Sequence, residues 1–328
     1  MVVERYAQEA LRITEQAAIQ ASRYVGKGDK NAADQAAVNA MRSQFEDAPF
    51  RGEVVIGEGQ KDEAPMLYIG EKVGAQPEPV LDVAVDPLEG TTLTANGARR
   101  ALCVLALGPE GAFLHAPDVY MMKLCVGPEA HGVIDLDADF ETNVRRVAEA
   151  KDMELSSLTC VLLDRERNEE YIRTLRELDC RVRLIEHGDI SAALSACVPE
   201  TEVDMLAGIG NSAEAVLSAA AAQCFEGDFE GRLNPIGTAQ HKRLDDMGFD
   251  DHARKYTVDE LAGGEEMVFS CSGVTDGDFL KGVHVREGEL VTHTLLITTE
   301  GIRRIIESRH IEPPAHDIND QPPLPGLI

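Results

Sequence analysis

Aromatic and basic residues are scarce in this chain, and their scarcity limits what it can bind. Its 328 residues include no tryptophan, and aromatic residues make up only 5% of them. Because 44% of the residues are hydrophobic, the core is expected to consist of alanine, valine, leucine and isoleucine. Only 31 basic residues stand against 58 acidic ones, which gives a net charge of −27. This charge argues against nucleic acid or an anionic membrane surface as a partner.

Closely spaced cysteines and long apolar runs are also missing. The seven cysteines are scattered, and most of them lie within apolar runs. This distribution predicts free, buried thiols in a reducing compartment rather than a disulfide framework or a zinc site. The sequence shows no apolar span of about 18 residues and no basic-then-apolar leader, so we expect a soluble, cytoplasmic protein.

Hydrophobic periodicity predicts an α/β protein made of two intimately packed subdomains. Strand–helix alternation begins at about residue 138, after a first half that is rich in strands. We expect an N-terminal subdomain at 1–137, a C-terminal α/β subdomain at 138–312 and a proline-rich tail at 313–328. The expected helices are 4–26, 32–45, 166–178, 189–197 and 213–225, the expected strands are 54–56, 80–85, 101–107, 119–126, 158–163, 181–185, 202–209 and parts of 266–299, and 234–252 is expected to be a loop.

The most informative motif is Val-Asp-Pro-Leu-Glu-Gly-Thr-Thr at 85–92, which follows the apolar run 80–85. It predicts a buried strand that ends at Asp86, a proline turn, a second carboxylate at Glu89, and a helix that opens at Gly90–Thr91. Free backbone N–H groups at a helix start can bind phosphate, but neighbouring carboxylates would repel it unless a divalent cation lies between them. The motif therefore indicates metal-assisted phosphate chemistry, and an ordinary acidic helix cap is the alternative.

Two glycine-rich segments place further acidic residues beside turns. In the segment 26–34, a glycine-rich turn leads into a helix that carries Asp34 one turn after Lys30. Glu58 follows an apolar run and stands between two glycines, and Asp62 lies four residues later. A solvated ion pair and a simple turn acid are the alternatives for these positions. A carboxylate at the end of a buried strand, however, lies where ligands bind in layered α/β proteins.

The remaining acidic position is Glu214, in the first turn of the expected helix 213–225, where it could equally well complement the helix dipole. Together these motifs supply carboxylate oxygens but no histidine or cysteine. Such ligands select Mg²⁺ or Mn²⁺ over zinc or copper. Several carboxylates around two or three such ions are a recurring arrangement for the hydrolysis of phosphate esters.

At this point the sequence resembles the class II fructose-1,6-bisphosphatases over nearly its whole length, from about residue 5 to residue 310. The resemblance implies the layered αβαβα fold of the lithium-sensitive sugar phosphatases, shared with inositol monophosphatases. It also implies Mn²⁺ or Mg²⁺ as cofactor and a homo-oligomer, either a dimer or a tetramer. The matching blocks are GKGDKNAAD (26–34), IGEGQKDEAPMLYIGEKVG (56–74), VDPLEGTT (85–92), APDVYMMKL (116–124), DRER (164–167), GDI (188–190) and GDFEGRL (227–233).

The resemblance assigns roles to the matching positions. Thr91 resembles the catalytic hydroxyl that orients the attacking water, Asp62 would help to remove its proton, and Lys30 would neutralise phosphate or metal-bound hydroxide. Asp189 resembles a ligand for sugar hydroxyls. The implied metal ligands are Asp34, Glu58, Asp86, Glu89 and Glu214, and the implied substrate contacts are Glu89, Gly90, Thr91, Tyr120, Arg165, Arg167, His187, Asp189 and Asn211, with Tyr120, Arg165 and Arg167 holding the distal phosphate.

The chain departs from the family pattern at two places that bear on substrate choice. His187 replaces the first aspartate of an Asp-Gly-Asp motif, so an imidazole stands where a carboxylate would accept sugar hydroxyls. Asn211 replaces a glycine, and because asparagine tolerates left-handed backbone angles, the loop shape is expected to survive. Alanines at 213 and 215 replace a proline and a glycine. These changes leave the metal set intact but leave the choice of sugar open.

The sequence therefore predicts a phosphatase that removes the 1-phosphate of fructose 1,6-bisphosphate in gluconeogenesis or a related carbon pathway. A preference for another sugar bisphosphate, such as sedoheptulose 1,7-bisphosphate, is one alternative. A catalytically silent phosphosugar-binding protein is another. A phosphatase for inositol or nucleotide monophosphates is disfavoured, because Arg165 and Arg167 suggest that a second phosphate is gripped.

Overall fold

The computed structural model describes residues 3–58, 67–264 and 266–311, and the chain divides into two compact units. Unit 1 comprises Met1–Glu110 and Glu266–Ile328, and unit 2 comprises Gly111–Glu265. The division therefore falls at residue 110, not at the expected residue 137, and the chain returns to unit 1 near its end. The reason is strand pairing, because β11 (Val268–Gly273) pairs with β4 (Leu102–Pro109) in one sheet. The predicted tail at 313–328 lies outside the described residues.

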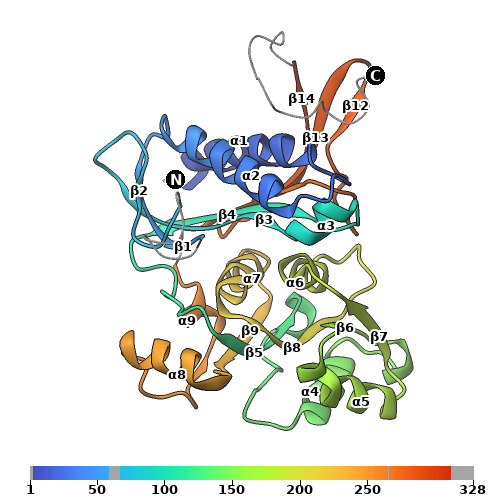
Figure 1. Cartoon of the computed structure of the whole chain (residues 1–328). Helices are drawn as coiled ribbons and strands as arrows, with labels where there is room; N and C mark the ends of the chain where they lie inside the picture. The colour runs from blue at the N-terminus through green and yellow to red at the C-terminus, as the bar shows by residue number, and fades with distance from the viewer. Residues whose placement is uncertain (1–2, 59–66, 265, 312–328) are drawn as a thin grey trace. The chain divides into compact units, whose positions relative to one another are not determined.

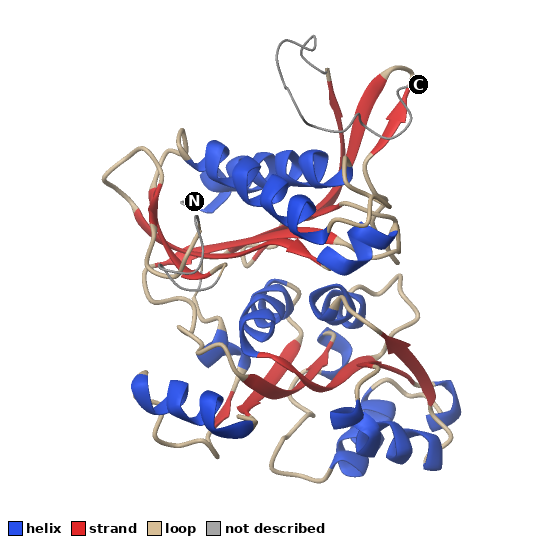
Figure 2. Cartoon of the chain, viewed as in Figure 1, coloured by secondary structure: helices blue, strands red, loops and turns tan. Residues whose placement is uncertain are grey.

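Unit 1 is a sheet with two long helices along one face (Figure 1, Figure 2). In α1 (Val3–Ser22), fully buried alanines recur at helical spacing, at positions 10, 17, 18 and 21. The helix α2 (Lys30–Phe45) packs beside it, and both helices belong to the same hydrophobic core as the sheet. The strands run in the order β12-β13-β11-β4-β3-β1-β2, with β14 paired to β13. The remaining elements of unit 1 are β1 (Arg51–Ile56), β2 (Lys72–Val73), β3 (Val80–Glu89), α3 (Thr91–Asn96), β12 (His284–Arg286), β13 (Glu289–Thr298) and β14 (Arg303–His310).

Strand β3 corrects one detail of the sequence prediction. The expected end of the strand at Asp86 is wrong, because β3 continues through the proline to Glu89. Its pairing with β4 is continuous up to Asp86 and then shifts register before Glu89. Proline removes one ladder hydrogen bond and is tolerated at such an irregularity. The irregular stretch therefore carries both predicted carboxylates to the end of the strand, where α3 begins.

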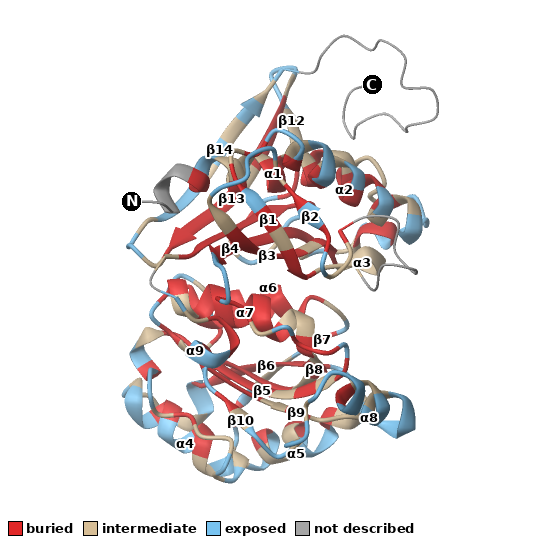
Figure 3. Ribbon diagram, turned by 90° about the vertical axis from the view of Figure 1, so that its left-hand side faces the viewer, coloured by how far each residue is buried: buried red, intermediate tan, exposed pale blue. Residues whose placement is uncertain are grey.

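Unit 2 is a second sheet, with strand order β10-β9-β5-β8-β6-β7 and helices on both faces (Figure 1). On one face lie α6 (Asp189–Cys197), all of whose residues are buried, and α7 (Ser212–Cys224), which Figure 3 shows largely buried. The other face is covered by α4 (Phe140–Ala150) and α5 (Glu169–Glu177). The remaining elements are β5 (Tyr120–Val126), β6 (Thr159–Leu163), β7 (Arg181–Ile185), β8 (Met205–Asn211), β9 (Asp228–Leu233), α8 (Gly237–Asp246), β10 (Lys255–Tyr256), α9 (Val258–Leu261) and the short helices η1 (Pro128–Ala130), η2 (Leu155–Ser157) and η3 (Glu166–Asn168).

The two units confirm the predicted α/β class. Helices cover one face of the sheet in unit 1 and both faces in unit 2. The expected loop at 234–252 is wrong, because it contains α8. The sequence hides this helix, since Leu244 is its only buried residue and it therefore shows no apolar stripe. All seven cysteines are free and buried, as predicted. Among the described residues, no helix is long and apolar enough to span a membrane.

Candidate active site

In unit 1, Glu58 occupies a position fixed by the backbone at the end of β1. Its N–H donates to the carbonyl of Leu67 at 2.9 Å. A Cβ on the preceding residue, Gly57, would lie only 2.2 Å from that carbonyl oxygen and 2.6 Å from Val54 Cγ1. Glycine is therefore required there, and the two chain segments approach closely enough to hold Glu58 at the strand end as predicted.

The glycine-rich turn before α2 is tied to the short helix α3. The N–H groups of Gly26 and Gly28 donate to the carbonyls of Thr94 and Ala95, each at 2.9 Å. Both glycines have positive φ, 72° and 76°, which favours glycine over other residues. These bonds join the start of the helix that carries Asp34 to the helix that begins with Thr91. The segment 26–34 and the start of α3 at Thr91, which are separate motifs in the sequence, therefore lie close together in unit 1.

The segment from Asp86 to Thr91 is shaped by its own hydrogen bonds. The Asp86 carboxylate accepts from the N–H of Leu88 at 3.1 Å, which bends the chain after the proline. Glu89 is buried, with 4% of its surface exposed. Gly90 then adopts a left-handed conformation (φ 87°) and precedes Thr91, the first residue of α3. The predicted helix start at Gly90–Thr91 is therefore confirmed.

The electrostatics show that the acidic side chains of unit 1 are neighbours. Burial, and then the nearby charge of Asp34, raises the pKa of Glu58 to about 7. Burial also raises the pKa of Asp34. The thiol of Cys103 is affected as well, because burial, followed by the carboxylates of Asp86 and Asp34, raises its pKa. Asp34 is therefore close enough to affect both Glu58 and the Cys103 thiol electrostatically, and Asp86 is close enough to affect the Cys103 thiol as well.

These donors suit a hard divalent cation, because they offer carboxylate oxygens in a partly desolvated place. Within residues 3–58, 67–264 and 266–311, no three histidine, cysteine or acidic side chains are grouped closely enough to hold a metal ion. Asp34 and Glu58 are near each other, and within the described residues they are not part of a group of three such ligands. Lys30 begins α2 with its side chain exposed, and Asp62 lies outside the described residues.

In unit 2, Tyr120 and Arg167 lie together, as the predicted phosphate cradle requires. The guanidinium carbon of Arg167 stands 4.4 Å from the centre of the Tyr120 ring, and its Nε donates to the carbonyl of Ile209 at 3.0 Å. Arg165 is held differently, because its guanidinium donates to the backbone carbonyls of Asp164 and Glu186. The backbone thus fixes both arginines, and the Arg167 plane lies against an aromatic face.

Asn211 joins the same part of unit 2, because it is paired with Tyr120 in the register of β5 and β8. Its side chain caps α7 by accepting from the N–H of Ala213 at 2.9 Å, and it donates to Asp118 Oδ1 at 2.9 Å. Its backbone is extended, with φ −76° and ψ 148°, so the tolerance of asparagine for left-handed angles is not needed here. Glu214 lies in the first turn of α7 as predicted.

Asp189 begins α6 and is buried against a residue that the sequence prediction missed. Its carboxylate forms an ion pair with Lys123 of β5, and the two side chains are only 3% and 1% exposed. His187, half-buried, precedes it across Gly188, which has φ 98°. The sequence did contain a sign of Lys123, a single lysine within the apolar run 119–126.

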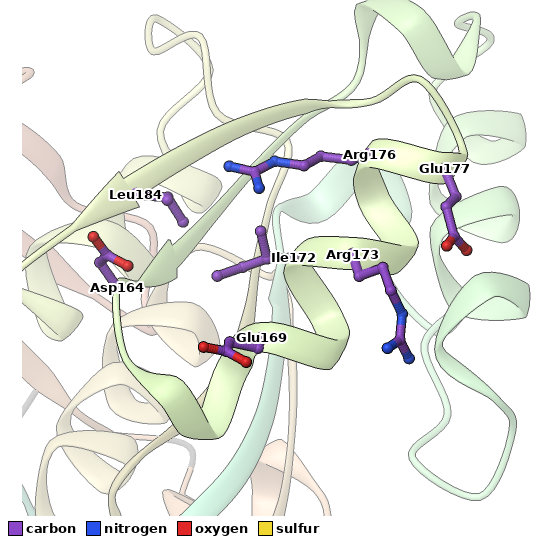
Figure 4. A pocket seen from close by; sticks show the side chains of 7 residues that line it. All are labelled: Asp164, Glu169, Ile172, Arg173, Arg176, Glu177 and Leu184. Carbon is purple, nitrogen blue, oxygen red and sulfur yellow. The ribbon is translucent and has the colours of Figure 1, made fainter.

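A hollow of about 530 Å³ also lies in unit 2, between α5 and β7 (Figure 4). Ile172 and Leu184 form its apolar part, Arg176 reaches across it, and Asp164 stands at its end. None of its lining residues is a predicted catalytic, metal or substrate residue. The hollow is thus distinct from the predicted substrate contacts.

Carboxylates as hard metal donors in unit 1, with guanidinium groups fixed by the backbone in unit 2, are typical of enzymes that act on phosphate esters. The chain belongs to the family described as bacterial fructose-1,6-bisphosphatase, glpX-encoded, whose model matches residues 4–310. The family is metal-dependent. The resemblance drawn from the sequence blocks is therefore confirmed.

Individual relatives agree with this family. The chain is 43% identical to a D-fructose 1,6-bisphosphatase class 2/sedoheptulose 1,7-bisphosphatase of Synechococcus sp. (strain JA-3-3Ab), covering 93% of this chain and 95% of the relative. It is 42% identical, with the same two coverages, to fructose-1,6-bisphosphatase 1 class 2 of Escherichia coli (strain K12). Among solved structures, an inositol monophosphatase from Anabaena (Nostoc) sp. PCC 7120 matches 60% of this chain and 73% of its own, at 14% identity and a TM-score of 0.32.

Proposed function

We propose that this chain hydrolyses the 1-phosphate of fructose 1,6-bisphosphate, with Mn²⁺ or Mg²⁺, to give fructose 6-phosphate and phosphate in gluconeogenesis. Family membership over residues 4–310 supports the reaction class. The structural observation that carries the proposal is the Glu58 carboxylate, held at the end of β1 near Asp34, where burial and then Asp34 raise its pKa to about 7. Two like charges kept together in a desolvated place are costly, and a bound divalent cation would remove that cost.

Unit 1 carries the proposed metal ligands Asp34, Glu58, Asp86 and Glu89, and Glu214 of unit 2 is proposed as a further ligand. A divalent cation held by such carboxylates would stabilise the negative charge that builds up on the phosphoryl oxygens. The hydroxyl of Thr91 would accept a hydrogen bond from the attacking water and so orient it in line with the leaving oxygen.

The other proposed roles concern charge and recognition. Lys30 would offset phosphate charge, and Asp62 would take up the proton of the attacking water that Thr91 orients. Glu89 and Gly90 are also proposed to contact the substrate. In unit 2, the proposed distal-phosphate ligands are Tyr120, Arg165 and Arg167, and the proposed sugar contacts are His187, Asp189 and Asn211.

The test is phosphate release by the purified protein with Mn²⁺ or Mg²⁺. Fructose 1,6-bisphosphate, sedoheptulose 1,7-bisphosphate, fructose 6-phosphate and inositol 1-phosphate are compared side by side. We expect fructose 1,6-bisphosphate to be turned over far faster than either monophosphate. Binding without turnover of any of the four compounds would point to a silent binding protein instead.

Thr91→Ala tests the catalytic role of the hydroxyl. Its kcat is expected to fall about 10²-fold or more, while stabilisation of the protein against heat by fructose 1,6-bisphosphate remains. Thr92→Ala, which removes the next hydroxyl along α3, is the matched control and is expected to keep its activity. Full activity of Thr91→Ala would remove this residue from the mechanism.

Sedoheptulose 1,7-bisphosphate is the second candidate substrate. The Synechococcus relative is named as a sedoheptulose 1,7-bisphosphatase as well as a fructose-1,6-bisphosphatase, and His187 stands where the family pattern has a carboxylate. Higher kcat/KM for this compound than for fructose 1,6-bisphosphate would make it the preferred substrate.

A further inference from the structure

Lys123 is a charged residue in a place where lysine is rarely found. It lies in β5, and its side chain is only 1% exposed. Its ammonium group pairs with the carboxylate of Asp189 at the start of α6, and its Nζ also donates to the backbone carbonyl of Asn211 at 3.4 Å. A buried charge persists only when it is paired and hydrogen-bonded, so this ion pair fixes both partners.

The backbone of β8 closes directly over the ion pair. A Cβ on Gly210 would lie 2.2 Å from Asp189 Oδ2 and 2.7 Å from Lys123 Nζ. Gly210 has no side chain, and the close approach that this permits places the next residue, Asn211, within reach of the ammonium group. Three elements, β5, α6 and β8, therefore converge on one buried charge in unit 2.

We propose that Lys123 is a positioning residue that sets the geometry of sugar recognition in this enzyme. It touches two of the residues proposed to contact the sugar, the side chain of Asp189 and the main chain of Asn211. The inference rests on the proposed function, because the sugar contacts are part of it. Lys123 does not bind substrate in this account, and its effect passes through the two residues that it holds.

Lys151 shows what a purely structural lysine looks like in the same unit. It pairs with Asp204 at 2.7 Å and with Glu129 at 3.3 Å, and neither partner is a predicted substrate residue. Lys123 differs because both of its partners, Asp189 and Asn211, are predicted substrate residues. Misplacing recognition groups by about 1 Å can reduce the rate by up to about 10²-fold, so loss of Lys123 is expected to weaken use of the sugar substrate by tenfold or more.

The experiment compares Lys123→Met with Lys151→Met, both in the full chain. For each protein, kcat and KM are measured with fructose 1,6-bisphosphate and with p-nitrophenyl phosphate, which has no sugar hydroxyls. We expect Lys123→Met to raise KM for fructose 1,6-bisphosphate about tenfold or more. The ratio of kcat/KM for fructose 1,6-bisphosphate to kcat/KM for p-nitrophenyl phosphate should fall by a similar factor. Lys151→Met is expected to leave that ratio within twofold of the wild type.

A second variant addresses the chance that Lys123→Met does not fold. Gly210→Ala keeps both charges but pushes against them, and Gly277→Ala, whose Cβ would be no closer than 3.4 Å to any atom, is its control. Folding is checked by near-UV circular dichroism and thermal unfolding. In whichever of the two variants folds, an unchanged ratio, or an equal loss on both substrates, would overturn the proposal. If neither variant folds, the Lys123–Asp189 ion pair is needed only for folding, and the proposal is also overturned.

Binding separates this proposal from the proposed reaction. Fructose 6-phosphate affinity, measured by calorimetry, requires no turnover. If the wild type binds fructose 6-phosphate but releases no phosphate from fructose 1,6-bisphosphate, the proposed function fails, while a tenfold weaker affinity in Lys123→Met still supports the positioning role. Equal affinities in the wild type and the variant would overturn it.

Discussion

Replacing Glu58 by glutamine is expected to make the metal-free protein more stable above neutral pH. Burial, followed by the charge of Asp34, raises the pKa of Glu58 from 4.5 to about 7. Between these two values the folded chain holds a proton that the unfolded chain has released. Folding stability therefore falls as the pH rises from 4.5 to about 7, and stays lower above that. Glutamine carries no charge, so the variant loses this dependence.

The size of the effect follows from the shift. A difference of about 2.5 pH units corresponds to at most about 3.4 kcal/mol. Glu58 is not fully enclosed, and solvent retains part of its hydration. We therefore expect about half of that value, roughly 1.5 kcal/mol. For a unit of this size, this is a rise in Tm of about 3–6 °C.

The assay is thermal unfolding in the presence of a chelator at pH 5.5 and pH 8, for the wild type and Glu58→Gln. Glu110→Gln, at an exposed glutamate, is the matched control and is expected to follow the wild type. The two proteins should already differ at pH 5.5, because the loss begins near pH 4.5, and they should differ more at pH 8. The same pH dependence in both proteins would refute the electrostatic reasoning.

Adding a divalent cation should reverse this difference. Metal binding needs the ionised carboxylate, so stabilisation by Mn²⁺ or Mg²⁺ is expected to increase as the pH rises through about 7. Glu58→Gln should gain much less from the cation at pH 8. Equal gains in both proteins would show that Glu58 is not a ligand.

Two further substitutions test the backbone of unit 1 and the phosphate cradle of unit 2. Gly57→Ala is expected to destabilise the fold by about 1–3 kcal/mol in denaturant unfolding, because its Cβ would meet the Leu67 carbonyl, whereas Gly277→Ala should be nearly neutral; equal midpoints would contradict the close contact. Arg167→Lys removes the planar group over the Tyr120 ring and is expected to raise KM for fructose 1,6-bisphosphate about tenfold in initial-rate assays. An unchanged KM would show that the stacked guanidinium is not needed for the distal phosphate.

Elements with a strong local pattern could be predicted from the sequence closely. The helix at 189–197 and the strand at 181–185 have the predicted bounds. In the first case Gly188 marks the start, and a run of small and apolar residues follows it. The helix α8 could not be predicted, because one buried leucine leaves no periodicity to read. Strand β3 was predicted to end early because proline usually ends a strand, and only its irregular pairing with β4 shows why it does not.

The site divides in the same way between local and tertiary information. The positions of Glu58 after a strand and of Glu214 in a first helical turn follow from neighbouring residues, and the structure confirms both. The ion pair of Lys123 with Asp189 joins segments far apart in sequence, so no spacing could predict it. The backbone angle of Asn211 was also beyond sequence reasoning. There, capping of α7 by the side chain favours an extended conformation over the left-handed one that asparagine tolerates.

The charge of the whole chain and the charge of its proposed substrate site have opposite implications. A net charge of −27 would repel a sugar bisphosphate at long range. At physiological ionic strength, however, charges separated by more than about 8 Å are largely screened, so the groups nearest the ligand decide binding. In unit 2 the groups proposed for this role are Arg165 and Arg167, which are fixed by backbone carbonyls. An acidic surface therefore argues against polyanions that need a broad basic face, such as nucleic acid, but not against a small bisphosphate held by two arginines.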